Sequence, residues 1–135
     1  MNIAVKKGKL ENFKSQAIVL ALFEKDRELT GPAESVDRLS GGLITDLLKN
    51  GDFAAKPSQI SVLYTRGGIA AQRIALVGLG KKEEINLEKV RAAYSKIMQH
   101  LRNINLTEAA VSIDLHLVPG QKERIAQSVV EGVLL

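Results

Sequence analysis

The sequence contains no cysteine and no tryptophan, and aromatic residues make up only 4% of its 135 residues. Without cysteine the chain can form no disulfide, no thiolate metal site and no cysteine nucleophile. The scarcity of aromatic residues leaves few side chains on which nucleic-acid bases could stack. Disulfide scaffolds and thiol enzymes are therefore excluded, and a base-stacking surface is not favoured.

Long apolar runs are also missing, since no stretch reaches the roughly 18 residues that a membrane helix needs. Residues 1–7 hold only a few apolar side chains before the first lysines, and the apolar segment of a signal peptide does not follow them. The lack of cysteine fits a reducing compartment. We therefore expect a soluble, cytoplasmic protein that does not associate with membranes.

The excess of positive charge is also small, because the chain has 19 basic and 15 acidic residues and a net charge of +4. The two signs are interleaved: Lys81 and Lys82 are followed by Glu83 and Glu84, and the charges alternate over residues 24–28. Interleaved charges form a solvated surface rather than a field of one sign. Nucleic-acid binding is therefore not favoured. DNA binding remains an alternative, and it would be recognised by an affinity that falls steeply with salt.

What is present is the composition of one globular domain, with 45% hydrophobic and 25% charged residues. Alternating or continuous apolar patterns predict five strands. They cover residues 2–6, 17–23, 60–65, 73–79 and 111–117. The third and fourth are joined by a connector that contains Gly67 and Gly68, which is typical of an antiparallel hairpin.

Apolar residues at helical spacing predict three helices. One covers residues 36–48 and stops at Asn50 and Gly51, one follows Asn86, and one follows Pro119 and Gly120. Glycine costs a helix interior about 1 kcal/mol, so we expect the first helix to begin after Ser40, with two glycines in its first turn. The predicted order is β-β-α-β-β-α-β-α. Apolar strands need cover on both sides, which predicts an α/β fold with a mixed central sheet between two helical layers.

Two glycine pairs are candidates for binding a nucleotide, a phosphate or another anion. Gly78 and Gly80 follow a buried strand, but Glu83 stands where a dinucleotide fingerprint has its third glycine, and the spacing of a P-loop is not met. We interpret this segment as a tight connection with close backbone approach. Gly41 and Gly42 could present backbone N–H groups to an anion at a helix N-terminus, although close packing of the helix on the sheet is the favoured interpretation.

Catalytic and metal-binding patterns are not found. Asp114 and His116 share one face of a predicted strand, but no third ligand accompanies them, and His100 lies near a helix end. The sequence has no Gly-x-Ser-x-Gly elbow and no His-Glu-x-x-His helix. We predict neither catalytic nor metal-ligating residues in this chain, and only a possible anion or ligand site at Gly41 and Gly42.

Several segments, taken in order, resemble the N-terminal domain of the leucyl aminopeptidase family (cytosol aminopeptidases, peptidase M17). Residues 73–82, which form an apolar strand and a Gly-Leu-Gly-Lys turn, are the most similar part, together with the helix that follows over residues 87–93. Further segments of resemblance are residues 17–20, 41–53 and 130–135. Each segment is weak alone, but their order and spacing cover almost the whole chain.

The resemblance implies a macro-domain-like α/β/α sandwich and a parent enzyme that removes N-terminal amino acids from peptides with two divalent metals, zinc or manganese. In that family the metal ligands, a catalytic lysine and a bicarbonate-holding arginine lie in a C-terminal catalytic domain, and hexamers are usual. Residues 1–135 are then a single non-catalytic domain whose partners are that catalytic domain and further copies of the chain. The apolar residues 132–135 favour a segment separated from a longer protein.

Macro domains proper bind ADP-ribose through a glycine loop before a helix, and Gly41 and Gly42 lie in the comparable place. However, Phe23 is followed by three charged residues, not by the small, asparagine-containing loop of ADP-ribose binders. We therefore expect likeness in fold only, which does not imply function. A module that binds ADP-ribose or a nucleotide remains an alternative.

Overall fold

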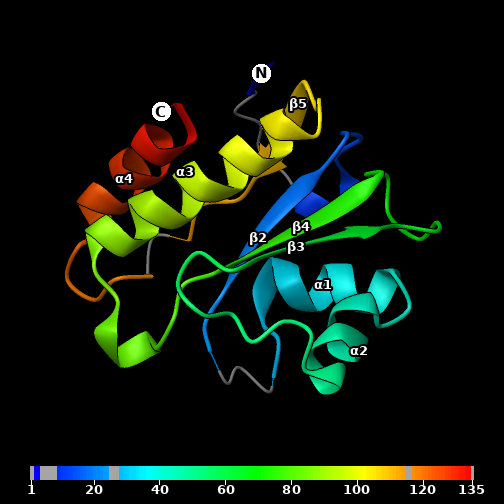
Figure 1. The fold of residues 1–135 in the computed structure, drawn as a ribbon, viewed down its shortest axis with the longest axis horizontal. Helices are drawn as coiled ribbons and strands as arrows, with labels where there is room; N and C mark the ends of the chain where they lie inside the picture. Colours follow the sequence, from blue (N-terminus) through cyan, green and yellow to red (C-terminus); the bar gives the residue numbers. More distant parts are fainter. Residues whose placement is uncertain (1, 4–8, 25–27, 115–116, 135) are drawn as a thin grey trace.

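The computed structural model describes residues 2–3, 9–24, 28–114 and 117–134. Its strands form one five-stranded sheet in the order β1-β5-β2-β4-β3 (Figure 1). They are β1 (Asn2–Ile3), β2 (Ile18–Leu22), β3 (Ile60–Tyr64), β4 (Arg73–Gly78) and β5 (Glu108–Val111). β2 runs parallel to both β4 and β5, whereas β3 pairs with β4 in the antiparallel direction. The predicted mixed sheet and the predicted hairpin are both confirmed.

Helices cover both faces of this sheet. Figure 1 shows α3 and α4 on one side of the strands and α1 and α2 on the other. The helices are α1 (Gly31–Leu39), α2 (Leu43–Asn50), α3 (Leu87–Asn103) and α4 (Lys122–Leu134), and two 3-10 turns are η1 (Leu10–Asn12) and η2 (Lys82–Glu84). The three-layer α/β/α sandwich is therefore confirmed. Within the described residues, none of the helices is long and apolar enough to cross a membrane.

The two cores of the sandwich follow from the alternation of side chains along β2 and β4. Val19, Ala75 and Val77 are buried in the core that includes residues of α3 and α4. Their neighbours Ile18 and Leu76 are buried in the core that includes residues of α1 and α2. Strands that are covered on both faces read as continuous apolar runs, which is why these two strands could be predicted from sequence.

The predicted first helix is instead two helices. α1 ends at Leu39, and Gly41 and Gly42 have φ angles of +80° and +86° before α2 begins at Leu43. Left-handed residues cannot continue a right-handed helix. α1 also begins earlier than expected, with Pro32 in its first turn, where the missing N–H group has no helical partner to lose.

The predicted fifth strand is misplaced. β5 ends at Val111, where its parallel pairing with β2 also ends, and Ile113 lies exposed beyond it. Residues 112–114 and 117 of the predicted strand are therefore not in a strand. His116, which was weighed as a ligand, lies outside the described residues. β5 itself holds Ala109 and Ala110, whose small side chains give a weak strand signal.

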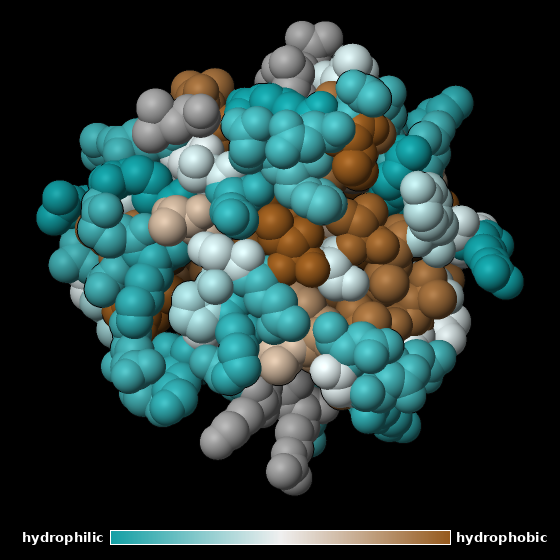
Figure 2. Space-filling model, viewed as in Figure 1, coloured by the Kyte–Doolittle hydropathy of each residue, from teal (hydrophilic) through white to brown (hydrophobic). Residues whose placement is uncertain are grey.

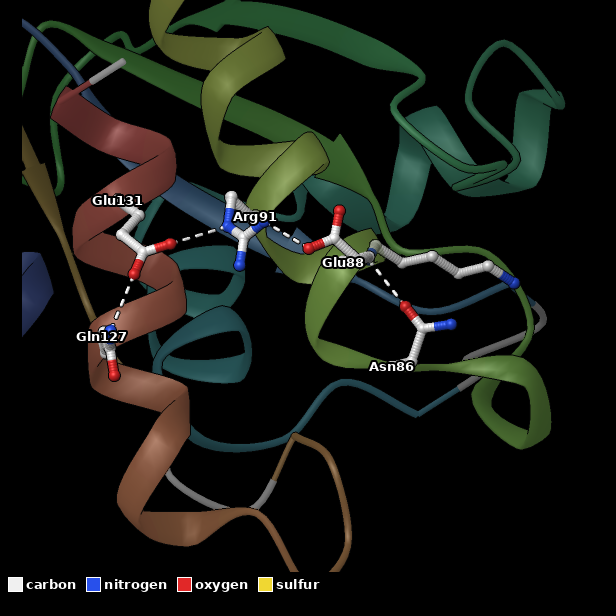
Figure 3. A network of polar contacts seen from close by, with 6 residues as sticks. Asn86, Glu88, Arg91, Gln127 and Glu131 are labelled. Carbon is white, nitrogen blue, oxygen red and sulfur yellow. Dashed lines mark hydrogen bonds and ion pairs between the residues drawn. The ribbon is translucent and has the colours of Figure 1, made fainter.

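α3 and α4 are joined by a network of polar contacts. Arg91 on α3 forms an ion pair with Glu88 of the same helix and another, of 2.9 Å, with Glu131 on α4 (Figure 3). Gln127 donates to Glu131 over 2.9 Å. At the start of α3, the side chain of Asn86 accepts a hydrogen bond from the backbone N–H of Lys89 and so caps the helix that was predicted to follow it.

Candidate functional site

A cavity of about 360 Å³ lies at the carboxyl end of β2. Ligands of open α/β sheets bind beyond the carboxyl ends of the strands, and sites for small molecules measure about 300–1,000 Å³. The lining comes from β2, the start of α1, η2, α3 and the segment after β5. The residues are Leu20, Ala21, Leu22, Phe23, Glu28, Leu29, Thr30, Pro32, Ala33, Lys82, Tyr94, Ser112, Asp114 and Leu117.

Backbone pairing brings two of these segments together. The N–H of Leu79 donates to the carbonyl of Leu22 over 2.8 Å, and the N–H of Glu24 donates to the carbonyl of Gly80 over 2.9 Å. These bonds continue the pairing of β2 and β4 beyond the strands and so place η2 beside the cavity. Lys82 lies there with its ammonium nitrogen 5.9 Å from the centre of the Phe23 ring, within the range of a cation–π contact.

The ionisable groups of the lining carry both signs. Glu28, Lys82 and Asp114 are exposed, whereas Tyr94 is buried. The Tyr94 hydroxyl lies 3.5 Å from the carbonyl oxygen of Ser112. Burial raises the pKa of the Tyr94 phenol and the negative charge of Asp114 raises it further. The phenol therefore stays neutral at physiological pH, and its O–H donates to the carbonyl of Ser112.

The lining offers apolar and charged side chains that can bind a ligand. A nucleophilic centre needs a nucleophile and a base within hydrogen-bond reach of each other, and the polar contacts among the described lining residues contain no such pair. Over residues 2–3, 9–24, 28–114 and 117–134, no three histidine, aspartate or glutamate side chains are grouped so that they could hold a metal ion. The described residues therefore do not fit a two-metal centre.

The predicted anion site is not part of this cavity, because neither Gly41 nor Gly42 lines it. The start of α2 carries an internal anion instead. The N–H groups of Ile44 and Thr45 both donate to one carboxylate oxygen of Asp37 over 2.9 Å, and the Thr45 hydroxyl donates to the other over 2.5 Å. Anion binding at the two glycines stays a prediction, and an external anion would compete there with Asp37.

The favoured interpretation of Gly41 and Gly42, close packing, is wrong. A Cβ atom at either position would meet no heavy atom within 4 Å. Glycine is needed there because both residues have positive φ angles, which other residues adopt only with strain. Sequence reasoning missed Asp37, although an acidic residue just before a glycine pair and a new helix is the available signal.

Replacing Asp37 by alanine is expected to lower the free energy of unfolding by about 2 kcal/mol. The substitution removes the two carboxylate oxygens that accept three hydrogen bonds from the start of α2. Urea unfolding followed by circular dichroism measures this effect. Asp52→Ala, at an exposed position just beyond α2, is the matched control and should change stability by less than about 0.5 kcal/mol. Equal effects at the two positions would contradict the assigned role of Asp37.

The tight connection predicted at Gly78 and Gly80 is confirmed. A Cβ atom at Gly78 would overlap the backbone of Ala55 and Lys56, and Gly80 has a φ of +78° and lies against Pro57. Because these glycines face residues 55–57 in this way, they leave no open loop to surround a phosphate. Sequence reasoning missed Lys82 as a lining residue.

Of Asp114 and His100, the two described residues weighed as ligands from the sequence, Asp114 lines the cavity. His100 lies exposed in the last turn of α3, where a positive charge would suit the helix dipole. The proposed pairing of Asp114 with His116 falls partly outside the described residues.

Solved structures share this fold at low sequence identity. The macrodomain of Mycobacterium tuberculosis DarG matches with a TM-score of 0.78 and 17% identity, over 98% of this chain and 90% of that one. A mutant of tomato leucine aminopeptidase matches with a TM-score of 0.73 and 20% identity, over 99% of this chain and 27% of that one. At such identities the likeness shows the fold alone, which is macro-domain-like, as predicted.

Sequence relatives are closer. A probable cytosol aminopeptidase of Pseudoalteromonas atlantica is 35% identical over 118 residues, which are 87% of this chain and 23% of the relative. One from Pseudomonas fluorescens is 33% identical over an alignment of 137 positions, which covers 98% of this chain and 27% of the relative. The chain thus spans about a quarter of the length of these relatives. The model of the cytosol aminopeptidase family's N-terminal domain matches residues 19–135, so the chain belongs to this family and corresponds to its N-terminal domain.

Proposed function

We propose that the chain is a non-catalytic accessory domain of a metal-dependent aminopeptidase that releases N-terminal amino acids from peptides. The match to the family's N-terminal domain, on a chain that spans only about a quarter of its relatives, carries this proposal. Catalysis, with two zinc or manganese ions, then belongs to a C-terminal catalytic domain of the parent. The described residues do not fit those ions, so no catalytic step is assigned to them.

Contact with the catalytic domain is supported by apolar side chains that α4 leaves uncovered. Val130 and Leu134 are four residues apart and therefore lie on one face of the helix, with 45% and 69% of their surfaces exposed. Ile104, just after α3, is exposed as well. Apolar surface of this kind is typical of interaction sites when it is contiguous. We propose that this face of α4 contacts the catalytic domain.

Assembly into a homo-oligomer, for which we propose a hexamer, is supported by the edge strand β3. Among the described strands, β3 pairs only with β4, and Ile60, Val62 and Leu63 are partly exposed on it. Figure 2 shows apolar side chains gathered in the middle of the face that β3 crosses in Figure 1. An uncovered edge strand invites pairing with another chain unless something protects it. We also propose that the parent acts in the cytoplasm, like the cytosol aminopeptidases that it resembles.

An assay of the purified chain tests the proposed division of labour. The chain is incubated with leucyl-p-nitroanilide and Mn²⁺ or Zn²⁺, with and without a chelator. The complete Pseudomonas fluorescens relative, treated in the same way, is the positive control. We expect turnover by the relative and none by this chain. Release of nitroaniline by the chain that chelation abolishes would overturn the proposal.

A further inference from the structure

The cavity beside β2 combines an apolar floor with charges of both signs, which contact with a second domain does not require. We propose that it binds a free α-amino acid with an apolar side chain. The biological sense of this ligand rests on the proposed function, because such amino acids are what the parent enzyme would release. Binding itself is argued from the lining.

The floor suits an aliphatic side chain. Leu20, Leu22 and Ala33 are buried and line the cavity, and Phe23 and Leu29 contribute partly buried surface. Burial of an aliphatic group against such side chains is favourable in proportion to the apolar area removed from water. Glycine, which has no side chain, would gain none of this contact. Leucine or a similar amino acid is therefore expected to bind more tightly than glycine.

A ligand carboxylate is matched by two sources of positive potential. One is the ammonium group of Lys82. The other is the N-terminal end of α1, where Thr30, Pro32 and Ala33 line the cavity. Within the described residues, the Thr30 side chain makes no capping hydrogen bond to the first turn of α1. This end of α1 thus differs from the start of α2, where Asp37 caps the N–H groups.

A ligand ammonium is matched by the carboxylates of Glu28 and Asp114, which also line the cavity. The same two carboxylates repel a phosphate or a pyrophosphate, which among the described lining residues would face two negative side chains and one lysine. The neutral Tyr94 phenol adds no charge to the lining, and its O–H donates to the carbonyl of Ser112. The lining therefore fits a zwitterion better than it fits a nucleotide or an uncharged apolar molecule.

Isothermal titration calorimetry of the chain with L-leucine at neutral pH tests the proposal. We expect saturable binding of one leucine per chain. Binding should weaken at least tenfold for 4-methylpentanoate, which lacks the ammonium group, for 3-methylbutylamine, which lacks the carboxylate, and for glycine. Absence of heat with millimolar leucine would overturn the proposal. So would equal binding of the analogues, or binding of ADP-ribose in preference to leucine.

Matched variants locate the site. Lys82→Gln and Asp114→Asn should each weaken leucine binding about tenfold, the loss of one charge-assisted contact. Lys81→Gln changes a neighbouring exposed lysine that does not line the cavity, and it should leave the affinity unchanged. Circular dichroism of each variant checks that it is folded, so that a loss of binding is not a loss of structure. Equal losses in Lys81→Gln, or no loss in either lining variant, would contradict this placement of the site.

The two proposals fail separately. Hydrolysis of leucyl-p-nitroanilide by the chain would overturn the accessory role, whatever the leucine titration shows. Failure of leucine to bind would overturn the amino-acid site and leave the accessory role in place.

Discussion

A methyl group added at Gly78 is expected to lower the free energy of unfolding by about 3 kcal/mol. Gly78 is buried at the end of β4, and its ideal Cβ position overlaps the backbone of Ala55 and Lys56. That backbone cannot move aside as a flexible side chain would, because hydrogen bonds hold it. Gly80 donates to the carbonyl of Ala55 over 3.0 Å, and Gln59, whose own carbonyl accepts from Gly78, donates to the carbonyl of Lys56 over 2.9 Å.

Urea unfolding of Gly78→Ala measures this loss. Gly67→Ala is the control that separates overlap from backbone strain, because Gly67 has a φ of +104° but no heavy atom within 4 Å of its Cβ position. Strain alone should cost about 1–2 kcal/mol there. If Gly78→Ala lost no more stability than Gly67→Ala, the close approach of β4 to residues 55–56 would be contradicted.

Phe53→Ala is expected to cost about 4 kcal/mol, within the usual range for removal of a buried phenylalanine. Phe53 is 1% exposed and belongs to the core that also holds Ile44 and Leu76. It follows Gly51, which ends α2 in the left-handed conformation. The ring therefore anchors the segment that leads from α2 to β3, and its removal leaves a cavity that a rigid sheet cannot close.

Thermal and urea unfolding of Phe53→Ala should be compared with Phe53→Leu, which keeps most of the apolar contact and should cost less than about 1.5 kcal/mol. Similar losses for the two variants would indicate that ring volume does not matter at this site. A loss below about 1 kcal/mol for Phe53→Ala would contradict the burial of this side chain.

Much of the fold could be predicted because its signals are local. β2 and β4 are covered on both faces and so read as apolar runs, and Asn86 caps α3 in the way that its side chain favours. β5 could not be placed from the sequence, because alanine is not a strand-forming residue. Ala109 is buried through tertiary packing, which a local sequence pattern does not reveal. Its position depends on pairing with β2, which lies far away in the sequence.

The cavity could not be predicted for the same reason. Its lining combines the end of β2 with Lys82, Tyr94 and Asp114, which no short sequence motif contains. The glycine pair at 41 and 42 was predicted as an anion site because glycines before a helix form a local pattern that can be recognised in a sequence. The group that binds the start of α2 is the carboxylate of Asp37, seven residues before Ile44.

Calorimetric titration of the purified chain with Mn²⁺ and with Zn²⁺ tests most directly whether this domain supplies any part of a metal centre. We predict no saturable binding of either ion, because the described residues hold no group of three potential ligands. Saturable binding of two ions per chain, accompanied by release of leucine from a leucyl substrate, would contradict the assignment of the catalytic centre to the remainder of the parent enzyme.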